Sequence, residues 1–322
     1  MNIEPLISII TPCFNGAKYL KAYFEGILNQ NHKNIELIFV NDGSSDDTEK
    51  IALQYGEKLK TNGMCFKYIY QKNAGAAAAL NRGLSCFEGE YLTRLDADDI
   101  MLPDNLSKKL EFLINNEEFG FVINGIQIVD ENDLDRKIGS AKRIKPNGND
   151  NFFEDLIYGH SVVWGPGTIL VRRECILEAF PQLSIYESKE GQNWQMMLPL
   201  AYLYKTGYID EELLKCVSHF DSHSRQNRRL EDWLKREQEF IVSCSETVKN
   251  IPKMSDSEKE NYIKKIRVFH NRNKLDIATE YLSFKYYIQI KSMLIEDGYK
   301  LSFKEKIYIF ARAIWHNIRG NK

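Results

Sequence analysis

The sequence has 322 residues and a mass of 37.5 kDa, which suits one large α/β domain with an added module, or two ordinary domains. Hydrophobic residues make up 43% and charged residues 27%, so a sizeable core is available and wholesale disorder is excluded. The net charge of −2 hides a division: residues 1–224 hold 22 Lys/Arg and 32 Asp/Glu (net −10), whereas residues 225–322 hold 21 and 13 (net +8). The acidic part argues against a nucleic-acid-binding body, and the basic part suits a membrane surface or an anionic partner.

Two absences in the sequence bear on where the protein works. No uncharged apolar run approaches the roughly 18–20 residues of a membrane-spanning helix, and Glu4 and Pro5 stand where a signal peptide is apolar. The six cysteines lie far apart without a Cys-x-x-Cys pair, which is typical of buried thiols in a reducing compartment. These features predict a cytoplasmic protein.

The first 130 residues alternate short apolar runs with helical stretches. The predicted strands are residues 6–11, 35–41, 66–70, 91–95 and 121–129, and the predicted helices are residues 18–29, 47–59, 76–84 and 105–115. Apolar runs without polar alternation are typical of strands covered on both faces. The pattern therefore predicts an α/β fold with a doubly wound, mostly parallel sheet, and a ligand crevice at the carboxyl ends of its strands.

The predicted secondary structure of the rest of the chain is first irregular, then mixed strand and helix, and finally helical. Residues 130–150 are rich in Asn, Asp, Lys and Gly and are expected to form a mobile surface loop. A strand at 169–172, a helix at 192–205 and a strand at 215–220 follow, and the pattern from residue 225 onward is helical. We therefore expect one domain over residues 1–224 and a helical extension over 225–322.

Polar loops follow four of the predicted strands, at residues 12–16, 41–47, 71–75 and 96–99. Because the carboxyl ends of parallel strands meet at one edge of a sheet, these loops are expected to converge. In the second loop Gly43 permits a left-handed turn and Ser44 can cap the next helix, but neither role explains Asp42. Its carboxylate can accept a hydrogen bond from a base or ribose in the crevice.

The fourth loop carries three carboxylates, at Asp96, Asp98 and Asp99. They repel one another in a low-dielectric crevice, and a divalent cation removes that penalty. Mg²⁺ or Mn²⁺ held by one or two protein oxygens and by phosphate oxygens is the common arrangement for nucleotide diphosphates. The alternative is a solvated acidic turn before Pro103, but the position at a strand end favours the metal.

Residues 9–15, 40–44, 73–75 and 95–99 resemble, in order and approximate spacing, the motifs of glycosyltransferase family 2, which has the GT-A fold. The resemblance covers about residues 6–225. It implies an inverting, metal-dependent transfer of a sugar from a nucleotide-diphosphate donor, commonly UDP-linked, with Asp98 on the metal. It also implies nucleotide binding in about residues 1–100 and an acceptor side in about residues 101–224. The donor-binding positions that it implies are Pro12, Phe14, Asn15, Asp42, Asn73, Gly75, Asp96 and Arg225.

Inversion needs a general base on the acceptor side. The family usually places it in an acidic pair at the start of a helix, where this sequence has Gln192 and Asn193, and neither can accept a proton as a base. We expect Glu190 to take this role, with Glu187 in reserve and Asn193 as a further catalytic-site position. The alternative is that Glu190 only stabilises the helix terminus.

A segment after the last strand of this region, residues 218–225, offers further ligands. His223 can complete the metal shell and Arg225 can contact the diphosphate, or both can be surface residues, with Asp221 pairing with Arg225. Trp164 and Trp194 can stack on sugar rings, although burial is ordinary for tryptophan.

The end of the chain, residues 303–319, has an apolar stripe at helical spacing beside basic side chains. Such a helix either docks on the domain or lies on an anionic membrane.

The function expected from these features is transfer of a hexosyl or N-acetylhexosaminyl group to a hydroxyl of a glycan or glycolipid, in bacterial-type surface polysaccharide assembly. Two alternatives stay open: a polyprenyl-phosphate acceptor, or a non-catalytic nucleotide-sugar-binding protein that has lost its base. A dinucleotide-dependent oxidoreductase is set aside because no Gly-x-Gly-x-x-Gly follows the first strand.

Overall fold

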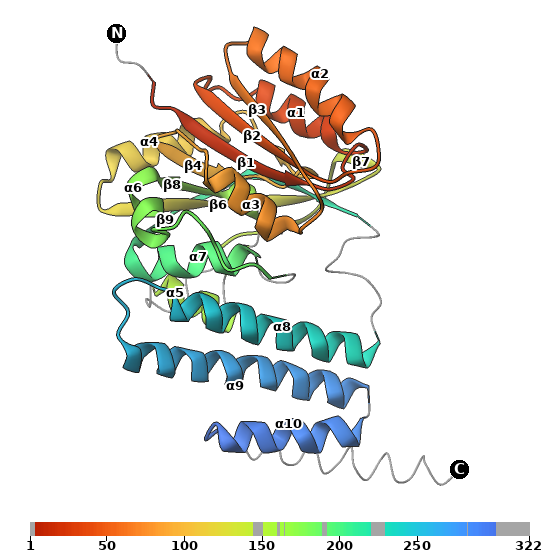
Figure 1. The fold of residues 1–322 in the computed structure, drawn as a ribbon, viewed down its shortest axis with the longest axis vertical. Coiled ribbons are helices and arrows are strands. Elements are labelled where there is room, and N and C mark those ends of the chain that lie inside the picture. The colour runs from red at the N-terminus through yellow and green to blue at the C-terminus, as the bar shows by residue number, and fades with distance from the viewer. Residues whose placement is uncertain are drawn as a thin grey trace.

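The computed structural model describes residues 4–143, 151–159, 162–163, 165–188, 192–219, 229–281 and 283–300. Within these residues a nine-stranded sheet follows the order β3-β2-β1-β4-β8-β6-β9-β5, and β7 pairs with β6 off this path. Figure 1 shows the sheet in the upper part of the molecule and a stack of helices below it. The predicted α/β class is confirmed.

The parallel part of the sheet is its N-terminal part. Its strands are β1 (Ile7–Cys13), β2 (Ile35–Asp42), β3 (Cys65–Gln71) and β4 (Tyr91–Arg94), joined by α1 (Leu20–Leu28), α2 (Thr48–Thr61) and α3 (Ala76–Leu84). Every residue of β2 is buried, as its uninterrupted apolar run predicts for a central parallel strand. The carboxyl ends of these strands therefore share one edge, and the polar loops follow from it.

The remaining strands make the sheet mixed: β5 (Ile100–Met101), β6 (Phe119–Asp130), β7 (Asp133–Ala141), β8 (Ile169–Arg172) and β9 (Lys205–Ser218). β8 runs antiparallel to both β4 and β6, β9 runs parallel to β6, and the short β5 runs antiparallel to β9. The sheet thus changes from parallel to mixed pairing after β4.

Two expectations about this part are wrong. Residues 133–141 are a strand that pairs antiparallel with β6, not part of a mobile loop, and β9 begins at Lys205 rather than at residue 215. The β7 side chains are mostly exposed and polar, so their pairing rests on backbone hydrogen bonds that a hydrophobic pattern does not reveal. The first half of β9 carries Asp210-Glu211-Glu212, which obscures its strand character in the same way.

Helices cover both faces of the sheet. One core packs α1, α2 and α4 (Asn105–Asn115) against it, and the other packs α3, α5 (Phe152–Tyr158), α6 (Arg173–Ala179) and α7 (Gln192–Leu203). A short 3₁₀ turn at Pro166–Thr168 leads into β8. The second core continues into the C-terminal helices, because Cys244, Val248 and Ile266 belong to it.

The C-terminal helices are α8 (Leu230–Lys249), α9 (Asp256–Glu280) and α10 (Phe284–Glu296), which confirms the helical pattern predicted there. α9 begins with a capping box, in which Ser255 and Glu258 satisfy each other's backbone N–H groups. Figure 1 shows α7, α8, α9 and α10 in successive layers, with α10 farthest from the sheet. Across the described parts of the chain, none of the helices has the length and apolar character needed to cross a bilayer.

Candidate nucleotide-sugar site

The loops after β1 and β2 are tied to each other by side-chain hydrogen bonds. The Asn15 backbone N–H donates to Ser44 Oγ (2.9 Å), and Ser45 N–H donates in return to Asn15 Oδ1 (2.8 Å). Asn15 has φ +50°, a left-handed conformation that asparagine tolerates better than most residues. Its amide oxygen therefore serves the fold, while Phe14 beside it projects into solvent.

Asp42 orders the loop after β3. Its side chain is 2% exposed, and Oδ1 accepts hydrogen bonds from Gln71 Nε2 (2.8 Å) and the Ala74 backbone N–H (2.9 Å). Oδ2 accepts a hydrogen bond from the Gly75 backbone N–H (2.8 Å). A buried carboxylate is stable only with such donors. Asp42 thus fixes the backbone at the start of α3. The sequence predicted a contact with a base or ribose for Asp42 and did not predict this structural role.

Two glycines let these loops approach each other. Gly43 has φ +76°, and a Cβ built there would lie 2.6 Å from the Asn73 backbone nitrogen. Gly75 has φ +95° and is the residue before the first turn of α3. The structure therefore brings together the three loops that carry Asn15, Asp42 and Asn73.

The three carboxylates after β4 have different surroundings. Asp99 is buried, accepts a hydrogen bond from the Val217 backbone N–H (3.3 Å), and has its pKa raised well above its usual value by burial and by the charges of Asp98 and Asp96. The side chains of Asp96 and Asp98 are 36% and 42% exposed. Only these two are therefore available to a ligand in the crevice.

Asp96 is paired with a buried arginine. Arg94 Nη2 donates to Asp96 Oδ1 at 2.9 Å. Burial raises the pKa of Asp96, and the Arg94 charge opposes that shift. The other terminal nitrogen of Arg94, Nη1, donates to Asn193 Oδ1 (3.1 Å) at the start of α7. One guanidinium thus joins the acidic motif to a predicted catalytic-site position.

His219 is a site residue that the sequence prediction missed. Its Nε2 lies 3.3 Å from Asp98 Oδ2, its Nδ1 lies 3.5 Å from Glu131 Oε2, and its ring lies 4.2 Å from the ring of Tyr19. The nearby carboxylate of Asp98 is the main cause that raises the pKa of His219. Glu131 also pairs with Lys18 Nζ at 2.7 Å. His219 could not be recognised from the sequence as a partner of Asp98. It comes near Asp98 because β9, which precedes it, pairs with the two-residue β5 directly after the acidic motif.

The side chains at this edge of the sheet fit a metal ion that takes most of its ligands from water and phosphate rather than from the protein. In the part of the chain that the structure describes, no group of three or more His, Cys, Asp or Glu side chains is arranged to hold a metal by itself. Asp98, with an exposed carboxylate and His219 next to it, offers one or two donors. That donor set fits Mg²⁺ or Mn²⁺, which keep water and phosphate oxygens as most of their ligands.

The acceptor side contains the other predicted residues. Glu187 is exposed, and its Oε1 accepts a hydrogen bond from Asn81 Nδ2 on α3 (3.1 Å). Trp194 donates from Nε1 to the Leu156 carbonyl (3.1 Å) and packs against Phe240 of α8, so its ring has a structural role. Glu190, His223, Arg225, Trp164 and the stripe over 303–319 lie outside the described residues.

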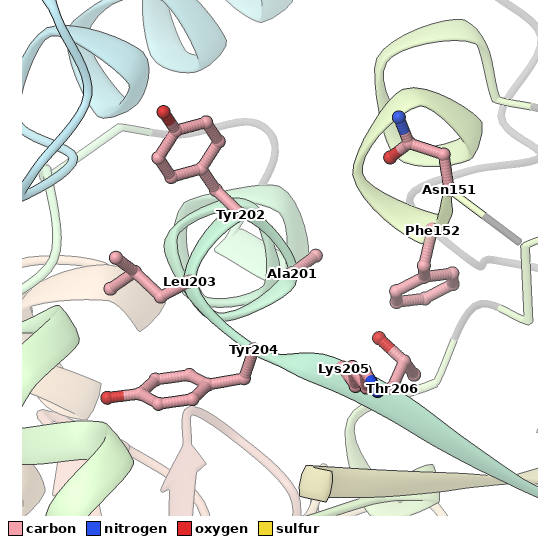
Figure 2. Close-up of a pocket in the computed structure, with 8 residues that line it drawn as sticks. All are labelled: Asn151, Phe152, Ala201, Tyr202, Leu203, Tyr204, Lys205 and Thr206. Atoms are coloured by element: carbon pink, nitrogen blue, oxygen red, sulfur yellow. The ribbon is translucent and has the colours of Figure 1, made fainter. Parts of the chain in front are cut away.

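A cavity of about 470 Å³ lies away from this site, between α5, the end of α7 and the start of β9. Figure 2 shows its lining, with Phe152 near Thr206 and the side chains of Tyr202 and Leu203 directed away from Phe152. The 14 residues of β9 span about 43 Å between this cavity and His219. The cavity is therefore separate from the nucleotide-sugar site.

The class of fold follows from the layers and the loops at the edge of the sheet. The structure aligns over 91% of its length with 81% of a chain of Staphylococcus aureus TarS that comprises residues 1–349, in complex with UDP-GlcNAc, with a TM-score of 0.64 and 17% identity. It also aligns over its whole length with 89% of the mannosyltransferase PcManGT from Pyrobaculum calidifontis in complex with GDP-Man and Mn²⁺, with a TM-score of 0.55 and 14% identity. The chain has the GT-A fold.

Residues 8–175 match the family described as Glycosyl transferase family 2, and this protein belongs to that family. The chain is 36% identical over 175 residues, 54% of its length, to the putative teichuronic acid biosynthesis glycosyltransferase TuaG of Bacillus subtilis. It is 40% identical over 130 residues, 40% of its length, to an uncharacterized glycosyltransferase of Rickettsia prowazekii. The chain covers 64% of the first relative and 38% of the second.

Proposed function

We propose that the protein is an inverting glycosyltransferase that moves a hexosyl or N-acetylhexosaminyl group from a nucleotide-diphosphate donor, a UDP-sugar, to a hydroxyl of a glycan or glycolipid. The observation that carries this is the pair of partly exposed carboxylates, Asp96 and Asp98, at the end of β4, on the same edge of the sheet as the loop that Asp42 orders. The similarity to TuaG, a putative teichuronic acid biosynthesis glycosyltransferase, supports a role in bacterial surface polysaccharide assembly, and the UDP-GlcNAc bound to TarS supports a UDP-sugar donor.

Each site residue has a defined part in this proposal. Asp96 and the loops after β1 and β3 hold the nucleoside. The positions in those loops are Pro12, Phe14, Asn15, Asn73 and Gly75. Arg225 contacts the diphosphate. Asp98 holds a divalent cation, with His219 in support and His223 as a further ligand. The cation, when bound, neutralises the charge that develops on the departing diphosphate. Glu190 removes the proton from the acceptor hydroxyl, with Glu187 as the second candidate and Asn193 beside them.

Nucleotide binding tests this proposal directly. In calorimetric titrations of the full chain with UDP and GDP, we expect UDP to bind in the presence of Mn²⁺ or Mg²⁺. Asp98→Asn is expected to remove the metal dependence of that binding, because the amide is a weaker ligand for a hard cation. Asp135→Asn, at an exposed carboxylate on β7, serves as the control. Failure of every nucleoside diphosphate to bind with either metal overturns the proposal.

One observation favours a second candidate, a nucleotide-sugar-binding protein without transfer activity. Asn193 stands where the family usually has its base, and its side-chain oxygen already accepts a hydrogen bond from Arg94. Hydrolysis of UDP-GlcNAc in the presence of Mn²⁺, followed by release of UDP, separates the two. Turnover that falls at least tenfold in Glu190→Gln supports the transferase, and tight UDP binding without turnover on any sugar donor or glycan supports the binding protein.

We further propose that the protein works in the cytoplasm against the inner face of the membrane, through its helical part (225–322) rather than its transferase domain (1–224). α10 carries an exposed apolar stripe: Phe284, Ile288 and Ile295 are 60%, 52% and 57% exposed. Lys285 and Lys291 are on the same helix, and residues 281–322 hold eight Lys/Arg against three Asp/Glu. Apolar side chains beside basic ones suit an anionic lipid surface.

Vesicle flotation tests the membrane contact. The full chain is expected to float with vesicles that contain phosphatidylglycerol and not with vesicles of phosphatidylcholine alone. Replacing Phe284, Ile288 and Ile295 together by Gln is expected to reduce flotation at least fivefold, whereas Leu53→Gln, at an exposed apolar site on α2, leaves it unchanged. Equal flotation of the triple variant, or a dimer in light scattering that the triple variant abolishes, contradicts lipid as the partner.

A further inference from the structure

A buried guanidinium connects the two sides of the site. Arg94 is the last residue of β4 and is 4% exposed. Side chains alternate along a strand, so Arg94 shares its face with Leu92, which belongs to the core that contains Met196 and Met197 of α7. Asn193 lies one turn earlier along α7 and meets Arg94 there. Along this face of β4 the surroundings thus change from the apolar core at Leu92 to a polar contact with α7 at Arg94.

Arg94 has few partners for a buried charge. Its single ion pair among the described residues is with Asp96, and its Nε, buried as well, has no hydrogen-bond partner there. A buried arginine is tolerated when its charge is compensated and its donors are satisfied. Losing either Asp96 or Asn193 therefore leaves a terminal nitrogen of Arg94 unpaired, and the guanidinium can no longer hold its orientation.

The chemistry of arginine also fixes the orientation of Asn193. A guanidinium carries donors and no acceptor, so the atom that faces Arg94 must be the amide oxygen. The amide nitrogen then points away from Arg94. Aspartate at this position would place a second carboxylate on the same guanidinium and compete with Asp96 for it.

We infer that Arg94 is a positioning residue that couples the first turn of α7 to the nucleotide side of the site, with Asn193 as the contact through which the coupling passes. This inference rests on the proposed function. The amide of Asn193 is uncharged, so it can hold Arg94 in its orientation without competing with Asp96 for the positive charge of the guanidinium. A change at the start of α7, on the acceptor side, therefore alters how Asp96 is held for the nucleotide.

UDP binding in the presence of Mn²⁺, measured by calorimetry on the full chain, tests the coupling without a known acceptor. Asn193→Ala is expected to weaken UDP binding three- to tenfold. Asn193→Asp is expected to weaken it more than tenfold, because the new carboxylate draws Arg94 from Asp96. Arg94→Met, which removes the charge at similar volume, is expected to weaken it at least tenfold.

The decisive comparison is Arg94→Lys, alone and combined with Asn193→Ala. Lysine keeps the charge but cannot bridge two partners with a planar fork, so UDP binding is expected to be intermediate and the further effect of Asn193→Ala to fall below twofold. Asn62→Ala, at the end of α2, is the control and is expected to leave UDP affinity unchanged. Melting temperatures of all variants separate loss of fold from loss of coupling.

Two results overturn the inference while UDP binding itself persists. One is an effect of Asn193→Ala below twofold in the otherwise unchanged chain. The other is an equal effect of Asn193→Ala with Arg94 and with Arg94→Lys, since independent sites give additive effects. If the unsubstituted chain binds no nucleoside diphosphate, the proposed function fails first and the inference fails with it.

Discussion

The nucleotide side and the acceptor side of the site are built differently. Both oxygens of Asp42 accept hydrogen bonds, and the loops after β1 and β2 exchange hydrogen bonds through Asn15. On the acceptor side, within the residues that the structure describes, Asn193 and Glu187 each have one side-chain hydrogen bond, to Arg94 and to Asn81 respectively. A dense network fixes the geometry of its members, whereas a single contact leaves geometry sensitive to its partner. The nucleotide side is therefore preorganised, and the acceptor side depends on the elements behind it.

The largest expected effect comes from removing the C-terminal helices that support the acceptor side. Truncation after residue 228 deletes Cys244, Val248, Ile251 and Ile266 from the core that α7 shares. At about 1.5–3 kcal/mol for each buried side chain, the loss is about 6–12 kcal/mol, comparable to the whole stability of a typical domain. The truncated chain is expected to be insoluble or to melt without a cooperative transition in calorimetry. A monomeric fragment with a melting temperature near that of the full chain contradicts this.

The second-largest effect is expected on the nucleotide side, where it tests whether Asp42 preorganises the site. Asp42→Ala removes a buried acceptor from the partly buried hydrogen bonds of the Ala74 and Gly75 backbone N–H groups and of Gln71. A hydrogen bond to a charged group contributes about 1.5–3 kcal/mol and these donors are partly solvated, so we expect a total loss of about 3 kcal/mol in urea unfolding. UDP affinity is expected to fall at least tenfold, because the backbone at the start of α3 loses its anchor. Asp47→Ala, at an exposed carboxylate nearby, serves as the control, and equal losses in both variants refute the role of Asp42.

Local sequence signals account for much of this architecture. Helices 76–84 and 105–115 and strand 169–172 have the predicted bounds, because their apolar spacing and flanking residues lie within the segment itself. β5 has only two residues and depends on a partner distant in the sequence, β9, whereas the polar side chains of β7 and of residues 205–212 of β9 do not mark these segments as strands. Propensity does not encode such pairing.

Dependence on contacts between distant segments also decided which site residues could be recognised from the sequence. Asp42, Asp96 and Asp98 were recognisable because each follows an apolar strand, at the edge where ligands bind in such sheets. His219 and Arg94 were not, because their importance comes from contacts with Asp98 and Asn193 across the sheet. Asp99 resembles Asp98 in sequence and differs only in burial, which requires the packing of β9.

A smaller effect concerns the metal ligand alone. Asp98→Ala removes a partly exposed side chain, so stability in urea is expected to change by about 0.5 kcal/mol or less. UDP affinity in Mn²⁺ is expected to fall at least tenfold, whereas affinity without metal stays within twofold, since the carboxylate acts through the cation. Binding that is lost equally with and without Mn²⁺ shows instead that Asp98 contacts the nucleotide or supports the loop.

The smallest effect concerns α9, one of the helical layers away from the site. Ser255 caps α9 together with Glu258, and the hydrogen bond from Ser255 lowers the pKa of Glu258 below its usual value of 4.5. A carboxylate with a lowered pKa in the folded state stabilises the fold above its unfolded pKa, and that contribution is lost as pH falls through the folded pKa. Glu258→Gln is therefore expected to lower the melting temperature at pH 7 and to have little effect below about pH 4. Glu260→Gln, at an exposed site in the same helix, is expected to show no such pH dependence. Equal destabilisation by Glu258→Gln at both pH values assigns the role of Glu258 to contacts that do not need its charge, such as the one with Tyr202.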